Sequence, residues 1–232
     1  MAIDERYLRQ MALPQIGERG QARLAVSRVL IIGVGGLGTA SSIYLAAAGV
    51  GHLGLVDFDV VSRSNLQRQV LYDECMVGKP KVICAKERLS RLNGDIDIKA
   101  INEPVTEDNA MSIISDYDIV VDGCDNMATR LLTSDICHSL GKPYVYGAIS
   151  EFGGQVAVLC TKGGKTLRDI FGWSSTDAVN ASNAVIGITP GIVGTVQANQ
   201  TLQLLCGFGE PLIDRLWVAD FLTMQTSVFD IA

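Results

Sequence analysis

Three charged residues that fall outside the predicted strands, Arg68, Lys81 and Asp125, could together serve a polyphosphate ligand. Fixed cations neutralise the crowded charges of such a ligand, and their effect grows where water is excluded. Arginine supplies a planar fork of donors, and lysine supplies a movable point charge. Asp125, with Asn126 next to it, could hold Mg²⁺, which prefers oxygen ligands and shares them with phosphates. Each residue alone would be read as a solvated surface charge, whereas the set predicts a nucleotide site.

A glycine run, Gly33-Val34-Gly35-Gly36-Leu37-Gly38, follows the apolar segment 29–32. A buried strand that leads through such a turn into a helix is typical of phosphate-binding sites. Asp57 and Asp59 end the next apolar segment, and the Asp57 carboxylate could bind ribose hydroxyls. Because dinucleotide enzymes share both features, these features leave ATP and NAD open. The segment that follows adds further candidates for the site: Ser64, Asn65, Leu66 and Gln67.

The elements that must position these residues alternate along the chain. Apolar runs predict strands at 28–32, 52–57, 96–101 and 118–121. Helices are predicted at 4–26, 36–48, 80–92, 106–115 and from 126 to just before residue 141. This alternation favours a doubly wound, mostly parallel α/β sheet of the Rossmann type. Ligands in such sheets lie beyond the carboxyl ends of the strands, so the glycine turn, Asp57 and Asp125 are expected to converge.

After Pro143 the pattern changes to antiparallel strands. Segments 144–150 and 155–160 predict one hairpin, and 216–221 with 225–229 predict a second. A helix is expected from Pro190 to Gly207. Residues 161–189 are rich in Gly, Ser and Asn and show little periodicity, which predicts a mobile, functional loop. Because we find no linker and no internal repeat, we expect a single domain over residues 1–232.

The composition is that of a globular protein, with 48% hydrophobic residues among 232 and a net charge of −6. This charge excludes a broad nucleic-acid-binding surface. The uncharged stretch 29–56 is long enough to cross a bilayer, but its pattern is that of a buried strand–helix–strand unit. The N-terminus lacks an apolar signal region, and six cysteines without a Cys-x-x-Cys pair predict reduced thiols and no zinc site. We therefore expect a cytoplasmic protein.

The chemistry that fits these residues needs no general base. His52 opens an apolar strand and His138 lies within a predicted helix, so both are interpreted as structural. The C-terminal carboxylate of a peptide has a pKa of about 3.5 and is already an ionised nucleophile. Its attack on the α-phosphate of ATP requires only positioning and charge neutralisation, which this set of residues could supply.

Several motifs, in this order and spacing, resemble the ThiF/MoeB/HesA family of bacterial relatives of ubiquitin-activating enzymes. They are Gly-x-Gly-Gly-x-Gly, Asp-x-Asp, Ser-Asn-Leu-Gln-Arg-Gln, Gly78-x-Pro80-Lys81 and Asp122-x-x-Asp125-Asn126. The resemblance covers nearly the whole chain, beginning with the Arg6-Tyr7-x-Arg9-Gln10 segment. Within the family, segment 125–130 looks closer to the thiamine branch than to the molybdopterin branch.

The resemblance implies a homodimer that binds MgATP and adenylates the C-terminal glycine of a small ubiquitin-like sulfur carrier ending in Gly-Gly. It implies that Gly36 contacts phosphate, Asp57 contacts ribose and Asp125 serves the metal. Arg9 would reach ATP from the other subunit. Residues 1–142 would form the nucleotide part, and residues 143–232 would bind the carrier and contribute to dimerisation. The triphosphate site would be lined by Ser64, Asn65, Arg68 and Lys81.

Two departures from the family pattern concern cysteine. The two Cys-x-x-Cys pairs that commonly bind zinc in the family are absent, so no zinc is expected. The position of the sulfur-handling cysteine of the thiamine branch falls at Asn180-Ala181-Ser182-Asn183, which holds no thiol. We therefore expect adenylation without a covalent enzyme–carrier link through this loop, with sulfur arriving from a separate donor protein. Cys124, beside the proposed metal ligand, is interpreted as a packing residue.

Four alternatives remain open on sequence alone. The carrier could belong to molybdopterin synthesis, or the acceptor could be another peptide or a small carboxylate. An NAD-dependent oxidoreductase would share the glycine turn but has no use for Arg68, Lys81 and Asp125 together. A non-catalytic ATP-binding scaffold is conceivable because the family cysteines are missing, although the charged set is retained.

Overall fold

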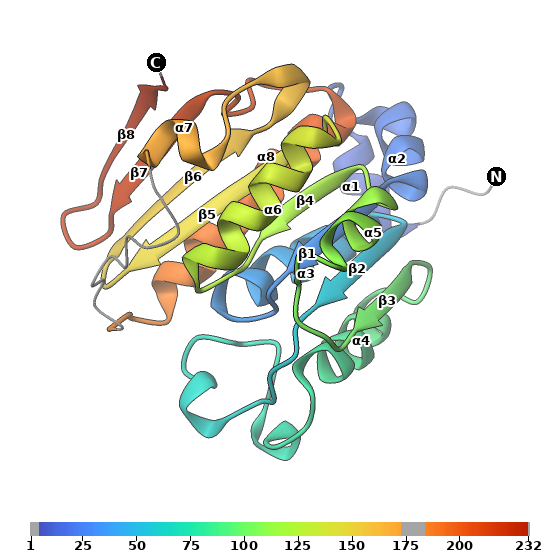
Figure 1. Ribbon diagram of the computed structural model, residues 1–232. Coiled ribbons are helices and arrows are strands. Elements are labelled where there is room, and N and C mark those ends of the chain that lie inside the picture. Colours follow the sequence, from blue (N-terminus) through green and yellow to red (C-terminus); the bar gives the residue numbers. More distant parts are fainter. Residues whose placement is uncertain (1–4, 173–183, 232) are drawn as a thin grey trace.

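The computed structural model describes residues 5–172 and 184–231. Its strands form an eight-stranded sheet in the order β3-β2-β1-β4-β5-β6-β7-β8 (Figure 1). The strands are β1 (Arg28–Ile32), β2 (His52–Val56), β3 (Asp97–Ile101), β4 (Ile119–Asp122), β5 (Tyr144–Ser150), β6 (Gly153–Leu159), β7 (Arg215–Asp220) and β8 (Gln225–Asp230). The α-helices are α1 (Leu8–Met11), α2 (Gly17–Val26), α3 (Gly36–Ala48), α4 (Lys81–Leu92), α5 (Ala110–Ser115), α6 (Met127–Ser139), α7 (Leu167–Phe171) and α8 (Ile188–Cys206). Short 3₁₀ helices lie at Glu5–Tyr7, Arg63–Asn65, Glu74–Met76 and Thr161–Gly163.

The sheet combines a parallel half with an antiparallel half. Strands β3, β2, β1, β4 and β5 pair in parallel, whereas β5, β6, β7 and β8 pair antiparallel. This confirms the fold class predicted from the sequence. The chain leaves β1 into α3 on one face and leaves β4 into α6 on the other. The carboxyl ends of β1 and β4 therefore form a switch point, where open α/β sheets bind ligands.

The central strands are buried on both faces. In β1, Val29 and Ile31 pack with α3, α4 and α8, whereas Leu30 and Ile32 pack with α5, α6 and α7. Figure 1 shows these two helix layers on opposite sides of the sheet. This explains why the parallel strands read as uninterrupted apolar runs and why the stretch 29–56 carries no charge. Among the described residues, no helix combines the length and apolarity that a membrane span requires.

The predicted helix at 4–26 is wrong in its continuity. The structure divides it into a 3₁₀ turn, α1 and α2, with residues 12–16 between the two helices. Gly17 has a φ of +55°, a left-handed conformation that glycine adopts without strain. Pro14, just before it, has no N–H to continue a helix. The break in the helix could therefore have been predicted from these two residues.

The predicted structureless loop at 161–189 contains regular structure at both ends. The side chain of Thr166 caps α7 by accepting a hydrogen bond from the Asp169 N–H, and Asp169 reciprocates. Val185 bridges to Glu151 beside the β5–β6 turn, and α8 begins at Ile188, before the predicted Pro190. Residues 173–183, with the Asn180–Asn183 segment, lie outside the described residues. Strand β6 also starts earlier than predicted, at Gly153, and α5 starts later, at Ala110.

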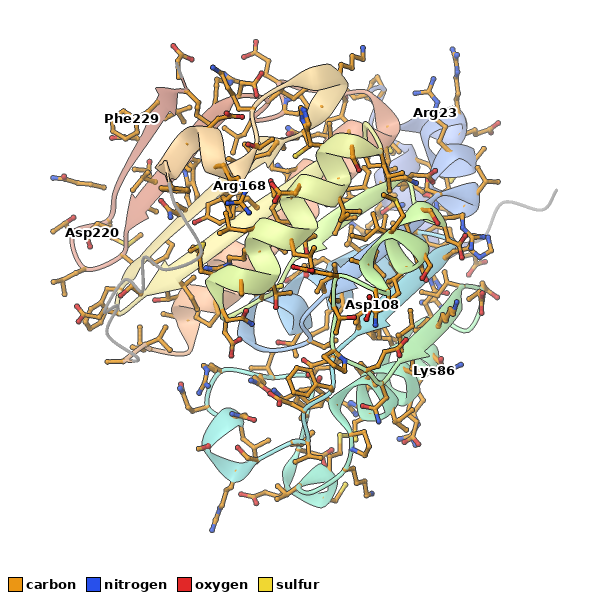
Figure 2. The ribbon with its side chains drawn as sticks, in the orientation of Figure 1. Arg23, Lys86, Asp108, Arg168, Asp220 and Phe229 are labelled. Atoms are coloured by element: carbon orange, nitrogen blue, oxygen red, sulfur yellow. The ribbon has the colours of Figure 1, made fainter. Side chains whose placement is uncertain are left out.

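Strand β8 forms one free edge of the sheet. All six of its residues are exposed, and Figure 2 shows Phe229 directed away from the body of the molecule. The opposite end of the sheet is β3, which is flanked by α4. The segment between β2 and α4 extends beyond the carboxyl ends of the parallel strands (Figure 1).

Candidate active site

The glycine turn between β1 and α3 leaves no room for a side chain at Gly33 or Gly38. Gly33 has a φ of +89°, and a Cβ atom there would overlap the backbone of Gly123, which follows β4. A Cβ atom at Gly38 would overlap the carbonyl oxygen of Gly33. The Tyr72 hydroxyl donates a hydrogen bond of 2.8 Å to the Val34 carbonyl, which holds the turn from outside. The glycines thus let β1, α3 and the β4 loop meet at one point.

Asp57 is oriented by the backbone around it. Its Oδ2 accepts a hydrogen bond from the Val34 N–H at 2.8 Å, and its Oδ1 accepts one from the Asp59 N–H at 2.9 Å. A carboxylate has about four lone-pair sites, so both oxygens keep capacity for a further donor. The half-buried Asp57 carboxylate is therefore preorganised to accept hydrogen bonds from ligand hydroxyls.

A cleft of about 620 Å³ opens beyond the carboxyl ends of β1, β2 and β4. Nine of the residues singled out from the sequence line it: Gly33, Gly35, Gly36, Asp57, Asp59, Arg68, Lys81, Asp125 and Asn126. The expected convergence of the glycine turn, Asp57 and Asp125 is thus present in the structure. Residues that sequence reasoning did not single out also line the cleft, among them Glu103, Pro104, Val105, Thr129, Arg130 and Ser150.

Six singled-out residues do not line this cleft. Gly38 lies in the first turn of α3, against the Gly33 carbonyl. Arg9 is an exposed residue of α1. Ser64 and Asn65 belong to a 3₁₀ turn in which the Asn65 side chain accepts a hydrogen bond from the Ser62 N–H. Leu66 and Gln67 continue from this turn toward Arg68, whose guanidinium donates to the Ser64 carbonyl at 3.1 Å.

Lys81 is a buried cation at the start of α4. Only 5% of the residue is exposed, and its Nζ lies 2.9 Å from Oδ2 of Asp59. Its backbone N–H also donates to the Asp59 carbonyl at 3.0 Å. Pro80, just before it, occupies the N-cap position, where a missing N–H leaves no helical bond unmade. Two separate contacts with Asp59 therefore hold Lys81 at the cleft wall.

Asp125 and Asn126 lie where the β4 loop enters α6. The Asn126 side chain caps this helix by accepting a hydrogen bond from the Thr129 N–H at 2.9 Å. In the described ranges, no three His, Cys, Asp or Glu side chains gather closely enough to hold a metal by themselves. Mg²⁺ commonly uses one or two carboxylates together with substrate phosphates. The exposed Asp125 carboxylate at the cleft fits this shared mode of binding.

Arg130 and Asp122 form an ion pair under the β4 loop that was not predicted from the sequence. Nε of Arg130 donates to Oδ2 of the fully buried Asp122 at 3.1 Å. Asp122 Oδ1 accepts a hydrogen bond from the Cys124 N–H, and Nη2 of Arg130 donates to the Cys124 carbonyl at 2.6 Å. Both polar groups of the Cys124 backbone are thereby held next to Asp125. The sequence motif contains Asp122 and segment 125–130 contains Arg130, but nothing in their spacing revealed that they pair.

The thiol of Cys124 is buried within this arrangement. Burial raises the pKa of Cys124 well above its ordinary value, and the charge of Asp122 acts in the same direction. A protonated thiol is a poor nucleophile. The geometry agrees with the interpretation of Cys124 as a packing residue.

A second cleft of about 330 Å³ lies beside the first, over β5, β6 and β7. Its walls are mostly small or apolar, with Ala148, Gly153, Gly154, Val218 and Ala219 among them. The residues that line both clefts are Arg130, Ile149 and Ser150.

Residues 7–232 match the ThiF family. The chain belongs to the ThiF family. This confirms the resemblance inferred from the motifs. A protein of Thermus thermophilus named "Sulfur carrier protein adenylyltransferase" is 43% identical over 226 residues, which are 94% of this chain and 83% of that protein. A Porphyra purpurea protein named "Probable molybdopterin-synthase adenylyltransferase" is 39% identical and is matched over 60% of its length.

Some relatives in the ThiF family are much longer than this chain. The "Adenylyltransferase and sulfurtransferase MOCS3" of Arabidopsis thaliana is 40% identical over 97% of this chain, which spans only 49% of that protein. Among solved structures, E. coli MccB with ATP has a TM-score of 0.88 at 20% identity, covering 100% of this chain and 72% of that one. PaaA has a TM-score of 0.84 at 22% identity, covering 98% and 73%. At these identities the structural likeness supports the fold alone.

Proposed function

We propose that this ThiF-family protein uses ATP to adenylate the C-terminal glycine of a ubiquitin-like sulfur carrier. Its membership of the family and the shared name of its relatives make it an adenylyltransferase. The name of the Thermus thermophilus relative supports a sulfur carrier as the acceptor. The observation that carries the proposal is the cleft itself, in which a glycine turn, Asp57, Arg68, Lys81 and Asp125 meet beside a second cleft.

In the proposed reaction, the chain positions two anions that would otherwise repel each other. Asp57 binds the ribose, the Gly33–Gly36 turn lies against the phosphates, and Arg68 and Lys81 neutralise the phosphate charge. The carboxylate oxygen forms a bond to the α-phosphorus, and the bond from that phosphorus to the bridging oxygen breaks. Pyrophosphate leaves with the electron pair, and no proton has to move. Asp125 would hold Mg²⁺, which supplies further charge neutralisation to the phosphates when bound.

Other assignments within the proposal rest on the motifs. We place Ser64, Asn65, Leu66, Gln67 and Asn126 around the triphosphate and Gly38 in support of the turn. Arg9, exposed on α1, would complete the site of a second copy, so the proposal includes a homodimer. Residues 1–142 would hold the nucleotide, and residues 143–232 would bind the carrier within one domain. A cytoplasmic location and a separate sulfur donor protein complete the proposal.

The carrier could belong to either of two biosynthetic pathways. We favour a thiamine-type carrier because of segment 125–130, with a molybdopterin-type carrier as the alternative. The names of the relatives include molybdopterin-synthase adenylyltransferase and MOCS3, which keeps this alternative open.

ATP–pyrophosphate exchange with purified carriers of both pathways tests the proposal. We expect exchange that requires a carrier ending in Gly-Gly and that disappears when the terminal glycine is removed. Comparing the two carriers at equal concentration would decide the pathway. Absence of exchange with every carrier, peptide or small carboxylate tested would refute adenylation by this chain and favour an ATP-binding scaffold.

A further inference from the structure

We infer that Arg130 binds the carboxylate of the acceptor through its Nη1 group, at the junction of the two clefts. This inference deepens the proposed function and rests on it. Adenylation requires the acceptor carboxylate to meet the α-phosphate. Arg130 lines the nucleotide cleft and the second cleft alike, and it is the one charged residue among the described residues that line the second cleft.

The hydrogen bonds of Arg130 leave one end of the guanidinium available. Nε donates to Asp122, and Nη2 donates to the carbonyls of Cys124 and Gly147, at 2.6 and 3.0 Å. Within residues 5–172 and 184–231, no hydrogen bond involves Nη1. Only 12% of the side chain is exposed. Nη1 is not among the buried side-chain atoms that lack a partner, so this end of the guanidinium is accessible from the clefts that Arg130 lines and can donate to an acceptor of a ligand.

The guanidinium is also fixed in orientation and charge. Its carbon lies 5.7 Å from the ring centre of Tyr146, which packs against it. Burial alone would lower the pKa of Arg130, but Asp122 together with Tyr146, Tyr144 and Cys124 raises the pKa above its ordinary value. Arg130 therefore stays protonated throughout the reaction and acts as a hydrogen-bond donor only. Because its rotamer is already fixed, it loses little conformational entropy when a carboxylate binds.

The second cleft indicates which carboxylate would arrive there. The small residues Ala148, Gly153, Gly154 and Ala219 line it, and an extended chain with minimal side chains could lie close against the backbone there. The terminal carboxylate of that chain would be its anionic end and would meet the cation at the junction. A charge-assisted hydrogen bond from Nη1 would then hold one carboxylate oxygen while the other attacks the α-phosphorus.

A purely structural role for Arg130 makes a different prediction. If Arg130 served only to hold the β4 loop, its replacement would disturb Asp125 and hence ATP as much as the acceptor. The Arg130→Lys and Arg130→Gln variants separate the two roles when the KM for the carrier and the Kd for ATP are both measured. Arg28→Lys is the matched control, because the guanidinium of Arg28 on β1 lies 5.7 Å from the ring centre of Tyr117 and Arg28 lines neither cleft.

We expect both Arg130 variants to raise the carrier KM at least about tenfold, with the Kd for ATP changed less than about twofold. Arg28→Lys should leave both constants unchanged. An unchanged carrier KM, or a Kd for ATP that rises as much as the carrier KM, overturns the inference. If the wild-type enzyme shows no ATP–pyrophosphate exchange with any of the carboxylates tested, the proposed function fails and the inference fails with it.

A second measurement does not depend on the folding of any variant. The probes are two synthetic peptides ending in Gly-Gly, one with a free carboxylate and one with a terminal carboxamide. Their binding to the wild-type protein is compared in the presence of a non-hydrolysable ATP analogue. We expect the carboxylate peptide to bind at least about tenfold more tightly, because the carboxamide lacks the charge that Nη1 recognises. Equal affinities would overturn the inference.

Discussion

The Nζ atom of Lys81 lies 2.9 Å from Oδ2 of Asp59, and the lysine is almost fully buried while the aspartate is half exposed. The pair faces the cleft in which the phosphates of ATP are proposed to bind. An incoming phosphate would therefore meet a cation that Asp59 already holds in position. Lysine suits this role because its ammonium group presents three donors and can serve two acceptors at once.

Replacement of Lys81 by alanine should lower the rate of ATP–pyrophosphate exchange by about 10²- to 10³-fold, since one fixed charge near the transferring phosphate is lost. The matched control is Lys86→Ala on the same helix, because Lys86 is exposed and lies outside the cleft (Figure 2). Its exchange rate should equal that of the wild type. Equal rates for the Lys81 and Lys86 variants would remove Lys81 from the proposed mechanism.

Replacement of Asp125 by alanine should abolish exchange, because the proposed Mg²⁺ ligand is lost. Asp125→Asn should retain some activity and require a higher Mg²⁺ concentration, since a neutral oxygen binds Mg²⁺ more weakly than a carboxylate. The measurement is exchange rate against Mg²⁺ concentration, with EDTA as the zero-metal point. Asp108→Ala, at an exposed position before α5, is the control (Figure 2). A normal Mg²⁺ curve for Asp125→Asn would refute the assigned role.

The glycine turn predicts a contrast between two glycine-to-alanine substitutions. A Cβ atom at Gly38 would overlap a backbone oxygen, so Gly38→Ala should lower the free energy of unfolding by about 3 kcal/mol or more. At Gly191 in α8, an added Cβ would meet no heavy atom of the described residues within 4 Å, apart from its chain neighbours and the adjoining backbone of the helix. Gly191→Ala should therefore stabilise the protein by about 0.5–1 kcal/mol through helix propensity. Urea denaturation followed by circular dichroism measures both, and equal stabilities would contradict the close packing of the turn.

Cys75 is the exposed one among the six free cysteines, and its thiol donates a hydrogen bond to Oδ1 of Asp73. This hydrogen bond raises the pKa of Cys75 above its ordinary value. A raised pKa means less thiolate at a given pH, so alkylation by iodoacetamide should be slow at pH 7 and accelerate as the pH rises. Asp73→Asn should lower this pKa and shift the rate profile to lower pH.

Mass spectrometry after alkylation would identify the modified residue and give its rate at each pH. The buried thiols, Cys124 included, should react only when the protein unfolds. An Asp73→Asn profile that coincides with the wild-type profile would show that the hydrogen bond to Asp73 does not determine the pKa of Cys75.

Much of the nucleotide cleft could be predicted from the sequence because its parts are local. The strand Val29–Ile32 and the glycines after it lie next to each other in the chain, and each signal predicts the same strand–turn–helix unit. Asp57 and Asp125 follow apolar strands, and the convergence of strand ends in a parallel sheet brings them together. The break at Pro14 and Gly17 and the Thr166–Asp169 capping box were equally local, and both signals were available in the sequence.

The role of Arg130 could not be predicted in the same way. An arginine within a helical pattern is usually exposed, and its burial depends on where β4, β5 and α6 meet in space. The pairing of Lys81 with Asp59 also spans 22 positions and requires the segment between β2 and α4 to fold back. Both contacts depend on tertiary packing, which short-range periodicity does not encode.

Strand β5 pairs with β4 on one side and with β6 on the other, and its residues Ile149 and Ser150 line both clefts. If an acceptor tail enters over the second cleft as proposed, a single strand of fixed length joins its place of entry to its place of reaction. Each residue of an extended tail spans about 3.3 Å, so a site of fixed length fits only a tail of matching length. A tail one residue too short stops before the phosphorus, and one residue too long must buckle, so tail length itself would select the substrate.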